Sequence, residues 1–164
     1  MAKLDHTLIF IVEDEPSYSK ALAHILDTKG FVNVRSFASG EEALDHLHLK
    51  PRIMIMDFRL GRDRMDGLQV LKILKKKNPE VQVIFLTKVD NLEIATETIK
   101  NGAYDYVVKN ETAFERIKNL LRRIIFENQI KRENLLLRQS RRVILWVIFL
   151  LFVTLFIIVA AYFL

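Results

Sequence analysis

The feature that most constrains the fold of this chain is a regular alternation of short apolar runs and amphipathic stretches between residues 8 and 112. Each apolar run contains β-branched or aromatic residues, as buried strands do, and the runs lie near residues 8–12, 32–37, 53–57, 82–87 and 104–108. The stretches between them have helical periodicity and lie near residues 16–29, 40–49, 67–77 and 91–101. This alternation predicts an α/β fold, a doubly wound five-stranded parallel sheet with right-handed crossovers and helices on both faces.

Glycine, asparagine and proline mark the ends of three predicted helices. Gly30 and Gly102 fall where a helix C-cap favours a residue that adopts positive φ. Asn78 and Pro79 stop the third helix. These stops agree with the helix ranges given above.

Four of the apolar runs end in a reactive polar side chain. Glu13 and Asp14 follow the first run, and Asp57 ends the third. Thr87 ends the fourth run, and Lys109 follows the fifth. Because sites in open α/β sheets form outside the carboxyl ends of the strands, we expect these groups to meet at one edge of the sheet.

The chemistry of these strand ends points to a divalent cation and a phosphoryl group. Three carboxylates would repel one another without a cation between them, and hard oxygen ligands open to solvent suit Mg²⁺. One carboxylate would then be free to attack phosphorus, while Lys109 and Thr87 stabilise the charge on the phosphoryl oxygens. The alternative is that the acids only cap helices and strand ends, as Asp14 would do for the helix that follows it.

A fifth helix is predicted from near Thr112, since neither glycine nor proline occurs from there to Arg142. Its first half has an apolar face, but a heptad seam along its length is weak because Asn128 and Lys131 fall at core positions. Two alternatives stay open for this helix. It forms a dimeric coiled coil, which would make the protein a homodimer, or it forms a solvated stalk. The predicted organisation is a domain of residues 1–125, a basic helical stalk of residues 126–142 and a transmembrane helix of residues 143–164.

Residues 143–164 are 22 consecutive residues without a charge, a glycine or a proline. As a helix they would extend about 33 Å, slightly more than the ~30 Å of a hydrocarbon core, with Trp146 and Tyr162 near opposite ends. Three arginines between residues 138 and 142 precede this run, so the positive-inside rule places the amino-terminal domain in the cytoplasm. We therefore expect a single-pass anchor in the inner (cytoplasmic) membrane, with the lipid bilayer as a partner.

The formal net charge of +5 is located in one segment. Residues 1–112 carry 16 basic and 17 acidic side chains, residues 113–142 carry 9 and 3, and residues 143–164 carry none. A globular part with so little net charge has no strong electrostatic reason to bind nucleic acid, so we expect no nucleic-acid partner. The absence of cysteine excludes disulfides and thiolate metal sites, and the amino terminus lacks the apolar segment of a secretory signal.

Over residues 7 to about 125 the chain resembles a receiver domain of the bacterial response regulators, which has a flavodoxin-like fold. The resemblance is carried by the strand-end acids, the threonine, the lysine and the stretch of residues 101–106 that leads to the lysine. It implies that Asp57 is the phosphoacceptor and that Mg²⁺ is the cofactor. Asp14 and Asp57 would bind the metal, Glu13 would hold it through water, and Arg59 would offer its backbone carbonyl.

The resemblance also implies a switch. Thr87 and Tyr106 match the hydroxyl and aromatic pair that rearranges on phosphorylation, Thr87 moving toward the phosphate and Tyr106 turning inward. Lys109 matches the lysine that contacts the phosphoryl group, so that Asp57, Thr87 and Lys109 form the expected catalytic set. The rearrangement would alter the surface of the fourth and fifth helices.

Four positions depart from the pattern of this family. Asn110 follows the lysine where receivers usually have proline, so a cis peptide bond is not expected there. The loop from Asp57 to Gly67 is longer than the common pattern and lacks its proline. Lys88 stands where a small residue is common and would crowd a phosphate or pair with it, and Glu13 replaces a more common aspartate.

The expected function is that of a membrane-tethered response regulator that accepts a phosphoryl group on Asp57 from a histidine kinase or phosphotransfer protein. It would signal through its receiver surface or its stalk helix, and it would not be an enzyme beyond catalysing its own phosphorylation and dephosphorylation. The alternative is a receiver that does not switch and acts as a membrane-bound scaffold or phosphate sink. A transcription factor is disfavoured because no helix-turn-helix domain fits after residue 125, and a haloacid-type phosphatase would need an aspartate where Arg59 stands.

Overall fold

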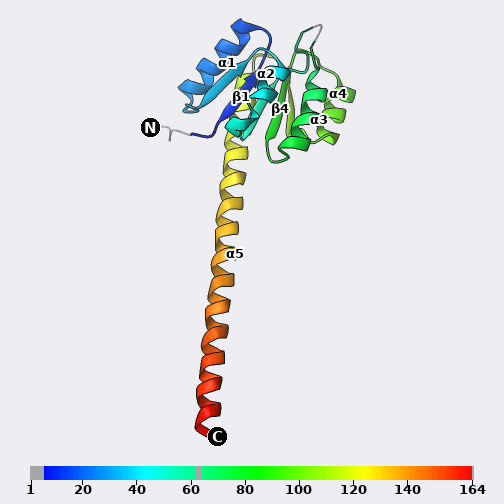
Figure 1. The fold of residues 1–164 in the computed structure, drawn as a ribbon. Coiled ribbons are helices and arrows are strands. Elements are labelled where there is room, and N and C mark those ends of the chain that lie inside the picture. The colour runs from blue at the N-terminus through cyan, green and yellow to red at the C-terminus, as the bar shows by residue number, and fades with distance from the viewer. Residues whose placement is uncertain (1–5, 62–63, 164) are drawn as a thin grey trace. The chain divides into compact units, whose positions relative to one another are not determined.

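The computed structural model describes residues 6–61 and 64–163, with side chains for all of these except 134–143 and 151–163. Its central element is a five-stranded parallel sheet in the order β2-β1-β3-β4-β5 (Figure 1). The strands are β1 (Ile9–Val12), β2 (Val34–Phe37), β3 (Ile53–Met56), β4 (Gln82–Thr87) and β5 (Asp105–Val108). The predicted α/β fold with a five-stranded parallel sheet is confirmed.

The register of the sheet brings the polar strand ends together. Val12 of β1 pairs with Met56 of β3, so Glu13 and Asp57 each lie one residue beyond the same pair. The backbone N–H of Asp57 donates to the carbonyl of Val12 at 2.9 Å. Strands β4 and β5 also end at paired residues, directly before Lys109. The acids and the lysine therefore leave the sheet at one edge.

Both faces of the sheet are buried, as is usual for parallel sheets. Alternate residues of β1, β3 and β4 contact one apolar cluster with α2 (Gly40–Asp45), α3 (Gly67–Lys77) and α4 (Leu92–Lys100). The intervening strand residues are also buried, together with Leu22 and Leu26 of α1 (Pro16–Thr28) and Ile117 and Leu121 of α5 (Ala113–Phe163). Helices α1 and α3 lie on opposite sides of the sheet in Figure 1, so helices cover both faces as predicted.

The helix prediction over residues 40–49 is wrong at its second half. Helix α2 ends at Asp45, and Leu47–Leu49 form a separate short 3₁₀-helix, η1. Between them, Nδ1 of His46 lies 2.8 Å from the carbonyl oxygen of Glu42. A side chain that bonds the carbonyl four residues earlier competes with the helical backbone, and this gives a physical reason for the break.

The other helix ends agree with the sequence signals. Gly30 and Gly102 adopt φ values of 93° and 95°, and Asn78 is the C-cap of α3. The start of α3 is a capping box, because the Asp66 side chain accepts from the N–H of Gln69 while the Gln69 side chain accepts from the N–H of Asp66. This cap fixes the first turn of the helix that follows the loop after Asp57.

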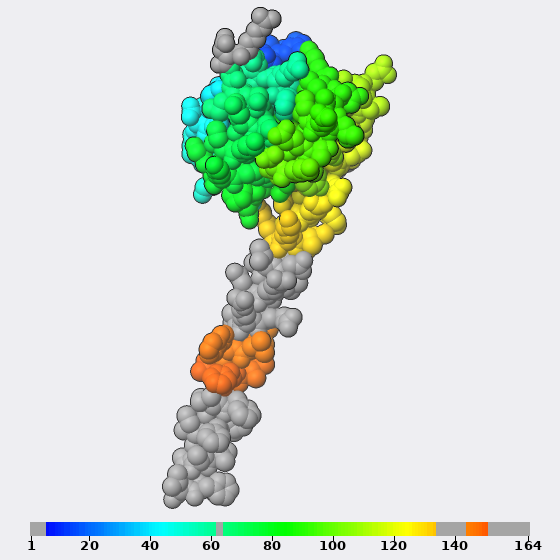
Figure 2. Space-filling model, turned by 90° about the vertical axis from the view of Figure 1, so that its right-hand side faces the viewer, coloured from blue at the N-terminus to red at the C-terminus, as the bar shows by residue number. Residues whose placement is uncertain are grey.

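Helix α5 runs from Ala113 to Phe163, and the chain divides into two compact units, Met1–Arg122 and Arg123–Leu164. Among the residues that the structure describes, no helix offers a stretch long and apolar enough to cross a bilayer. Within the span predicted over residues 143–164, only the side chains of 144–150 are described, and the others lie outside the described set. These seven side chains are all apolar and at least half exposed (Figure 2, orange).

Candidate functional site

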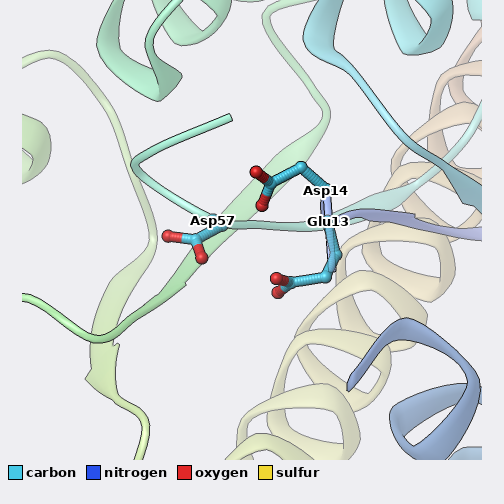
Figure 3. Close-up of side chains that lie close together, drawn as sticks. All are labelled: Glu13, Asp14 and Asp57. Atoms are coloured by element: carbon cyan, nitrogen blue, oxygen red, sulfur yellow. The ribbon is translucent and has the colours of Figure 1, made fainter. Parts of the chain in front are cut away.

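Three carboxylates lie together at the carboxyl end of the sheet. Glu13 and Asp14 directly follow β1, and Asp57 directly follows β3, the neighbouring strand. One oxygen from each side chain lies within 4.8 Å of the other two (Figure 3). Glu13 and Asp57 are buried, whereas Asp14 is exposed. The parallel strands thus bring together the acids that the sequence places at their ends.

Lys109 stands between two of these acids. Its Nζ atom lies 2.6 Å from Oε2 of Glu13 and 2.6 Å from Oδ2 of Asp57. Only 5% of the lysine side chain is exposed. The sequence predicts that the carboxylates need a cation between them, and the Lys109 ammonium is such a cation for two of the three.

The pKa values of this cluster follow from two acids sharing one lysine. Burial raises the pKa of Glu13, and the hydrogen bond and charge of Lys109 offset only part of that rise. Burial also lowers the pKa of Lys109, but its bonds to Asp57 and Glu13 outweigh burial, so the pKa is raised overall. The Lys109 ammonium therefore stays charged at neutral pH. It is one cation shared by two carboxyl groups, those of Glu13 and Asp57.

The second oxygen of Asp57 is held by the backbone. The N–H of Arg59 donates to Oδ1 of Asp57 at 3.1 Å. Helix α3 begins close by at Gly67, whose N–H donates to the carbonyl of Phe58 at 2.8 Å. A Cβ atom on Gly67 would lie 2.6 Å from the Phe85 ring and 2.9 Å from the Asp57 carbonyl oxygen, so glycine is required for this close approach. The backbone on both sides of the acid is therefore fixed.

The long loop after Asp57 is tied to the start of α2. The N–H of Met65 donates to Oε1 of Glu41 at 2.8 Å, and the guanidinium of Arg64 donates to the carbonyl of Ala38 at 2.7 Å. The hydrogen bond from Met65 is the largest of the effects that lower the pKa of Glu41. These bonds hold the described end of the loop against the start of α2.

The predicted switch pair lies on the two strands at one side of the sheet. Thr87 is buried, and its hydroxyl accepts from the N–H of Val89 at 3.3 Å. Tyr106 is also buried, and its hydroxyl donates to the carbonyl of Val89 at 2.6 Å. Burial raises the pKa of Tyr106, so this hydroxyl keeps its proton. The Tyr106 ring already lies inward in this structure, whereas the family resemblance predicts that it turns inward only after phosphorylation.

A pocket opens over the acids, and an exposed ion pair stands at its rim. The three acids line this pocket together with Glu15, Arg59, Thr87, Lys88 and Val89. Nζ of Lys88 lies 2.7 Å from Oε2 of Glu15, so the partner of this lysine is a carboxylate at the start of α1. The N-cap of α1 is Glu15, and its side chain makes no capping hydrogen bond. The alternative role of Asp14 as the cap of this helix is therefore not observed.

Tyr18, in the first turn of α1, was not identified from the sequence. Nζ of Lys109 lies 4.3 Å from the centroid of its ring, and the ring of Phe114 stacks on it at 5.6 Å between centroids. Burial, followed by the charges of Glu13 and Asp57, raises the pKa of Tyr18 to about 12. The only signal in the sequence is an aromatic residue in the helix turn after the acids, and such a residue usually indicates core packing.

The donor set suits a hard divalent cation. Carboxylate oxygens are the ligands that Mg²⁺ prefers, and this ion usually retains several waters, as a site open to a pocket allows. One lysine against three carboxylates leaves an excess of negative charge. The residues present therefore fit the metal that the sequence predicts.

Comparison with known proteins agrees with this geometry. The profile of the response regulator receiver domain matches residues 9–122. The nitrogen assimilation regulatory protein NtrX of Azorhizobium caulinodans is 34% identical over 126 residues, which are 76% of this chain and 27% of that protein. The chain thus spans little more than a quarter of the length of this relative.

Solved structures show the same fold. The receiver domain of NtrX from Brucella abortus has a TM-score of 0.65 and 31% identity, and the match covers 71% of this chain and 96% of that one. The beryllofluoride-activated NtrC4 receiver domain dimer has a TM-score of 0.66 and 24% identity over 74% of this chain and 98% of that one, a likeness of fold alone.

Proposed function

The chain belongs to the response regulator receiver domain family, and we propose on this basis that it accepts a phosphoryl group on Asp57 from a histidine kinase or a phosphotransfer protein. Asp57 is buried and lines an open pocket, with one carboxylate oxygen bonded to Lys109 and the other to a backbone N–H. The chemistry of the protein would be limited to gaining and losing this group.

The transfer requires little covalent chemistry from the protein itself. A carboxylate oxygen of Asp57 forms a new P–O bond while the P–N bond of a phosphohistidine donor breaks, and the imidazole leaves with that electron pair and takes up a proton. In the later hydrolysis, water forms a new P–O bond while the P–O bond to Asp57 breaks, so that the carboxylate leaves with that electron pair and inorganic phosphate is released. Both steps need an acid that is held in place and an environment that stabilises negative charge.

Lys109 supplies positive charge on this path. Its ammonium contacts Asp57 already, and the more negative oxygens of a phosphoryl group on Asp57 would become its strongest partners within reach. The hydroxyl of Thr87, at the end of the neighbouring strand, would donate to the same oxygens after rotating away from Val89. Charges act more strongly at buried positions than in water, which favours this arrangement.

Glu13, Asp14 and Asp57 would hold Mg²⁺, with the backbone carbonyl of Arg59 as a further ligand. When bound, the ion neutralises the charge of the carboxylates and of the phosphoryl oxygens. The two buried acids already share Lys109, so the exposed carboxylate of Asp14 provides the accessible oxygen at which the site can be loaded.

The buried contact between Lys109 and Asp57 carries the proposal, and acetyl phosphate provides its test. The full chain, incubated with acetyl phosphate and Mg²⁺, should gain one phosphoryl group by intact mass spectrometry. Asp57→Asn should abolish the gain, whereas Asp27→Asn, an exposed acid on α1, should leave it unchanged. Equal labelling of Asp57→Asn and the wild type would refute the proposal.

A second function, a receiver that does not switch, is favoured by Tyr106. Its ring is already buried and its hydroxyl already bonds Val89, so phosphorylation has little left to rearrange at this residue. Amide hydrogen exchange of α4 and β5 with and without beryllofluoride separates the two functions. A change in protection supports switching, and unchanged protection supports a scaffold or phosphate sink.

We further propose that residues 143–164 anchor the chain in the inner membrane with the receiver in the cytoplasm. The proposal is supported by the 22 uncharged residues of this run, and by the seven described side chains of 144–150, whose apolar surface water does not favour. The arginines before the run support the orientation. Homodimerisation through the stalk of residues 126–142 and the absence of a nucleic-acid partner stay predictions.

Membrane fractionation tests the anchor with a matched pair of variants. The wild type and Val153→Leu should sediment with membranes and resist carbonate extraction. Val153→Arg, near the middle of the run, should reduce the membrane fraction, because a buried arginine costs roughly 2.5–3.5 kcal/mol on insertion. Recovery of the wild-type chain in the carbonate supernatant would contradict the anchor.

A further inference from the structure

Beyond the acceptance of a phosphoryl group, we infer that Tyr18 positions Lys109 and couples it to the first turn of α5 through Phe114. The inference rests on the proposed function, because the event to be transmitted is the arrival of a phosphoryl group at Asp57. The route differs from the predicted threonine and tyrosine pair, since it passes through α1 and reaches α5.

Lys109 needs a contact that holds it while its other partners change. Its flexible four-carbon chain does not fix the ammonium by itself. Glu13 and Asp57 each accept from Nζ at 2.6 Å, but both carboxylates are also the groups that would bind a metal or receive a phosphoryl group. The centroid of the Tyr18 ring lies 4.3 Å from Nζ, within the ~6 Å range of a cation–π contact. This ring would neither bind the metal nor receive the phosphoryl group. The ring therefore persists as a partner when the carboxylates change theirs.

The same ring continues the contact to α5. Tyr18 and Phe114 stack with 5.6 Å between centroids and an interplanar angle of 26°. Phe114 is the second residue of α5, and both side chains are half-buried. Because stacked rings favour a limited set of offsets and angles, a shift of the Tyr18 ring changes the preferred position of Phe114. The side chain of Lys109 thus reaches the first turn of α5 through two rings.

The backbone between Lys109 and α5 offers no comparable freedom. The N–H of Lys109 donates to the carbonyl of Thr87 at 2.8 Å. Asn110 accepts at its side-chain oxygen from the N–H of Thr112 at 3.0 Å and from its hydroxyl at 2.9 Å, and its carbonyl accepts from the N–H of Ala113 at 3.1 Å. The residue that replaces the usual proline therefore builds the turn before α5, with a trans bond to Lys109. With this backbone fixed, movement is left to the side chain.

Phosphorylation would act on this route by changing the partners of the ammonium. The acyl phosphate bond takes up one carboxylate oxygen of Asp57, and the phosphoryl oxygens attract Nζ away from its present position. The ring of Tyr18, held in the first turn of α1, limits how far the lysine moves and takes up the displacement. The Phe114 ring then changes its position on the Tyr18 ring.

The positioning role is tested on the full chain without any phosphoryl donor. Labelling with ¹³C at the lysine ε carbons reports the ring current of Tyr18 on Lys109, whose signal is assigned by its absence in Lys109→Arg. An upfield-shifted ε-methylene signal is expected in the wild type and in Tyr18→Phe, which keeps the ring. In Tyr18→Leu the signal should return to the position of exposed lysines. An unshifted signal in the wild type, or the same shift in Tyr18→Leu, would overturn the positioning role.

A second readout is kinetic. The phosphorylation rate with acetyl phosphate should fall in Tyr18→Leu by about 2- to 30-fold, the range expected from losing one cation–π contact, and should recover in Tyr18→Phe. Folding, measured by circular dichroism, should be the same in Tyr18→Leu and Tyr18→Phe, so that a rate lost only in Tyr18→Leu reflects the missing ring and not misfolding. Equal rates in Tyr18→Leu and the wild type count against the inference.

The coupling to α5 is tested with beryllofluoride and Mg²⁺. The ring signals of Phe114 should move on addition in the wild type and stay in place in Tyr18→Leu, although Asp57 is intact. The same movement in both chains would overturn the coupling. A wild-type chain that does not respond to beryllofluoride refutes the proposed function and the coupling together, whereas an unshifted Lys109 signal refutes the positioning role whatever beryllofluoride does.

Discussion

Two lysine and glutamate pairs at the same edge of the sheet have nearly the same geometry and very different surroundings. Lys109 lies 2.6 Å from Glu13, with 5% and 3% of the two side chains exposed. Lys88 lies 2.7 Å from Glu15, with 70% and 44% exposed. The exposed pair is screened by water and restricts two mobile side chains, whereas the buried pair cannot lose a partner without leaving a charge in the interior. Burial, more than distance, decides what a pair contributes.

The two glutamates show the same contrast in their acidity. Burial raises the pKa of Glu13, although Lys109 opposes it. The hydrogen bond from Lys88, followed by the one from Ser17, lowers the pKa of Glu15. The two residues are only two positions apart in the chain, but burial governs the pKa of Glu13 and hydrogen-bond partners govern the pKa of Glu15.

Removing each lysine should separate the two pairs by the largest margin. Lys109→Met should lower the free energy of unfolding by about 3–5 kcal/mol, because it strands two buried carboxylates without their cation. Lys88→Met should leave it unchanged within error. Amide hydrogen exchange in β3 of the full chain measures both, without added metal. Similar losses in the two variants would contradict the contrast.

Magnesium should restore much of what Lys109→Met removes. A ligand that binds only the folded chain stabilises it by about 2.7 kcal/mol at a hundred times its Kd, and the excess negative charge in this variant favours the cation. The same exchange measurement, repeated over a magnesium titration, follows the gain. The control is Asp14→Asn added to Lys109→Met. It removes the exposed ligand and should weaken the stabilisation by magnesium. A variant that gains nothing from magnesium would argue against a metal site.

The smallest effect is on pH dependence, and its sign differs between the two glutamates. The raised pKa of Glu13 means that the folded chain binds its proton more tightly, so stability falls as pH rises from 4.5 to the folded pKa. The lowered pKa of Glu15 means that its contribution is present above 4.5 and is lost as pH falls through the folded pKa. Carboxyl ¹³C titration without magnesium, assigned with Glu13→Gln and Glu15→Gln, should place Glu13 above Glu15. The reverse order would show that partners outweigh burial at Glu13.

The fold and the position of the acids follow from local patterns in the sequence. Short apolar runs with helical stretches between them require a parallel sheet, and a residue that ends such a run must lie at the sheet edge. Glu13, Asp14 and Asp57 could be located in this way because the period of the strands and the ends of the runs are local features. The split of the second predicted helix could not be anticipated, because it depends on the side chain of His46.

The partners within the site could not be predicted, because they depend on how distant side chains pack. Lys88 and Glu15 are 73 positions apart, and Lys109 and Glu13 are 96 apart. Tyr18 carries no signal of its site in the sequence, since its contact with Lys109 exists only after α1 and the end of β5 have packed on the sheet. Sequence patterns locate the charged groups, and packing decides which of them meet.

The central claim is that the buried pair of Lys109 and Asp57 is the phosphoryl site and that the exposed pair is not. Fluorine NMR of the full chain with Mg²⁺ and beryllofluoride tests this most directly, because the bound adduct gives its own signals. Bound signals are expected in the wild type and in Lys88→Met, none in Asp57→Asn, and weakened ones in Lys109→Met. Bound signals of wild-type strength in Asp57→Asn, or equal losses in Lys88→Met and Lys109→Met, would contradict the claim.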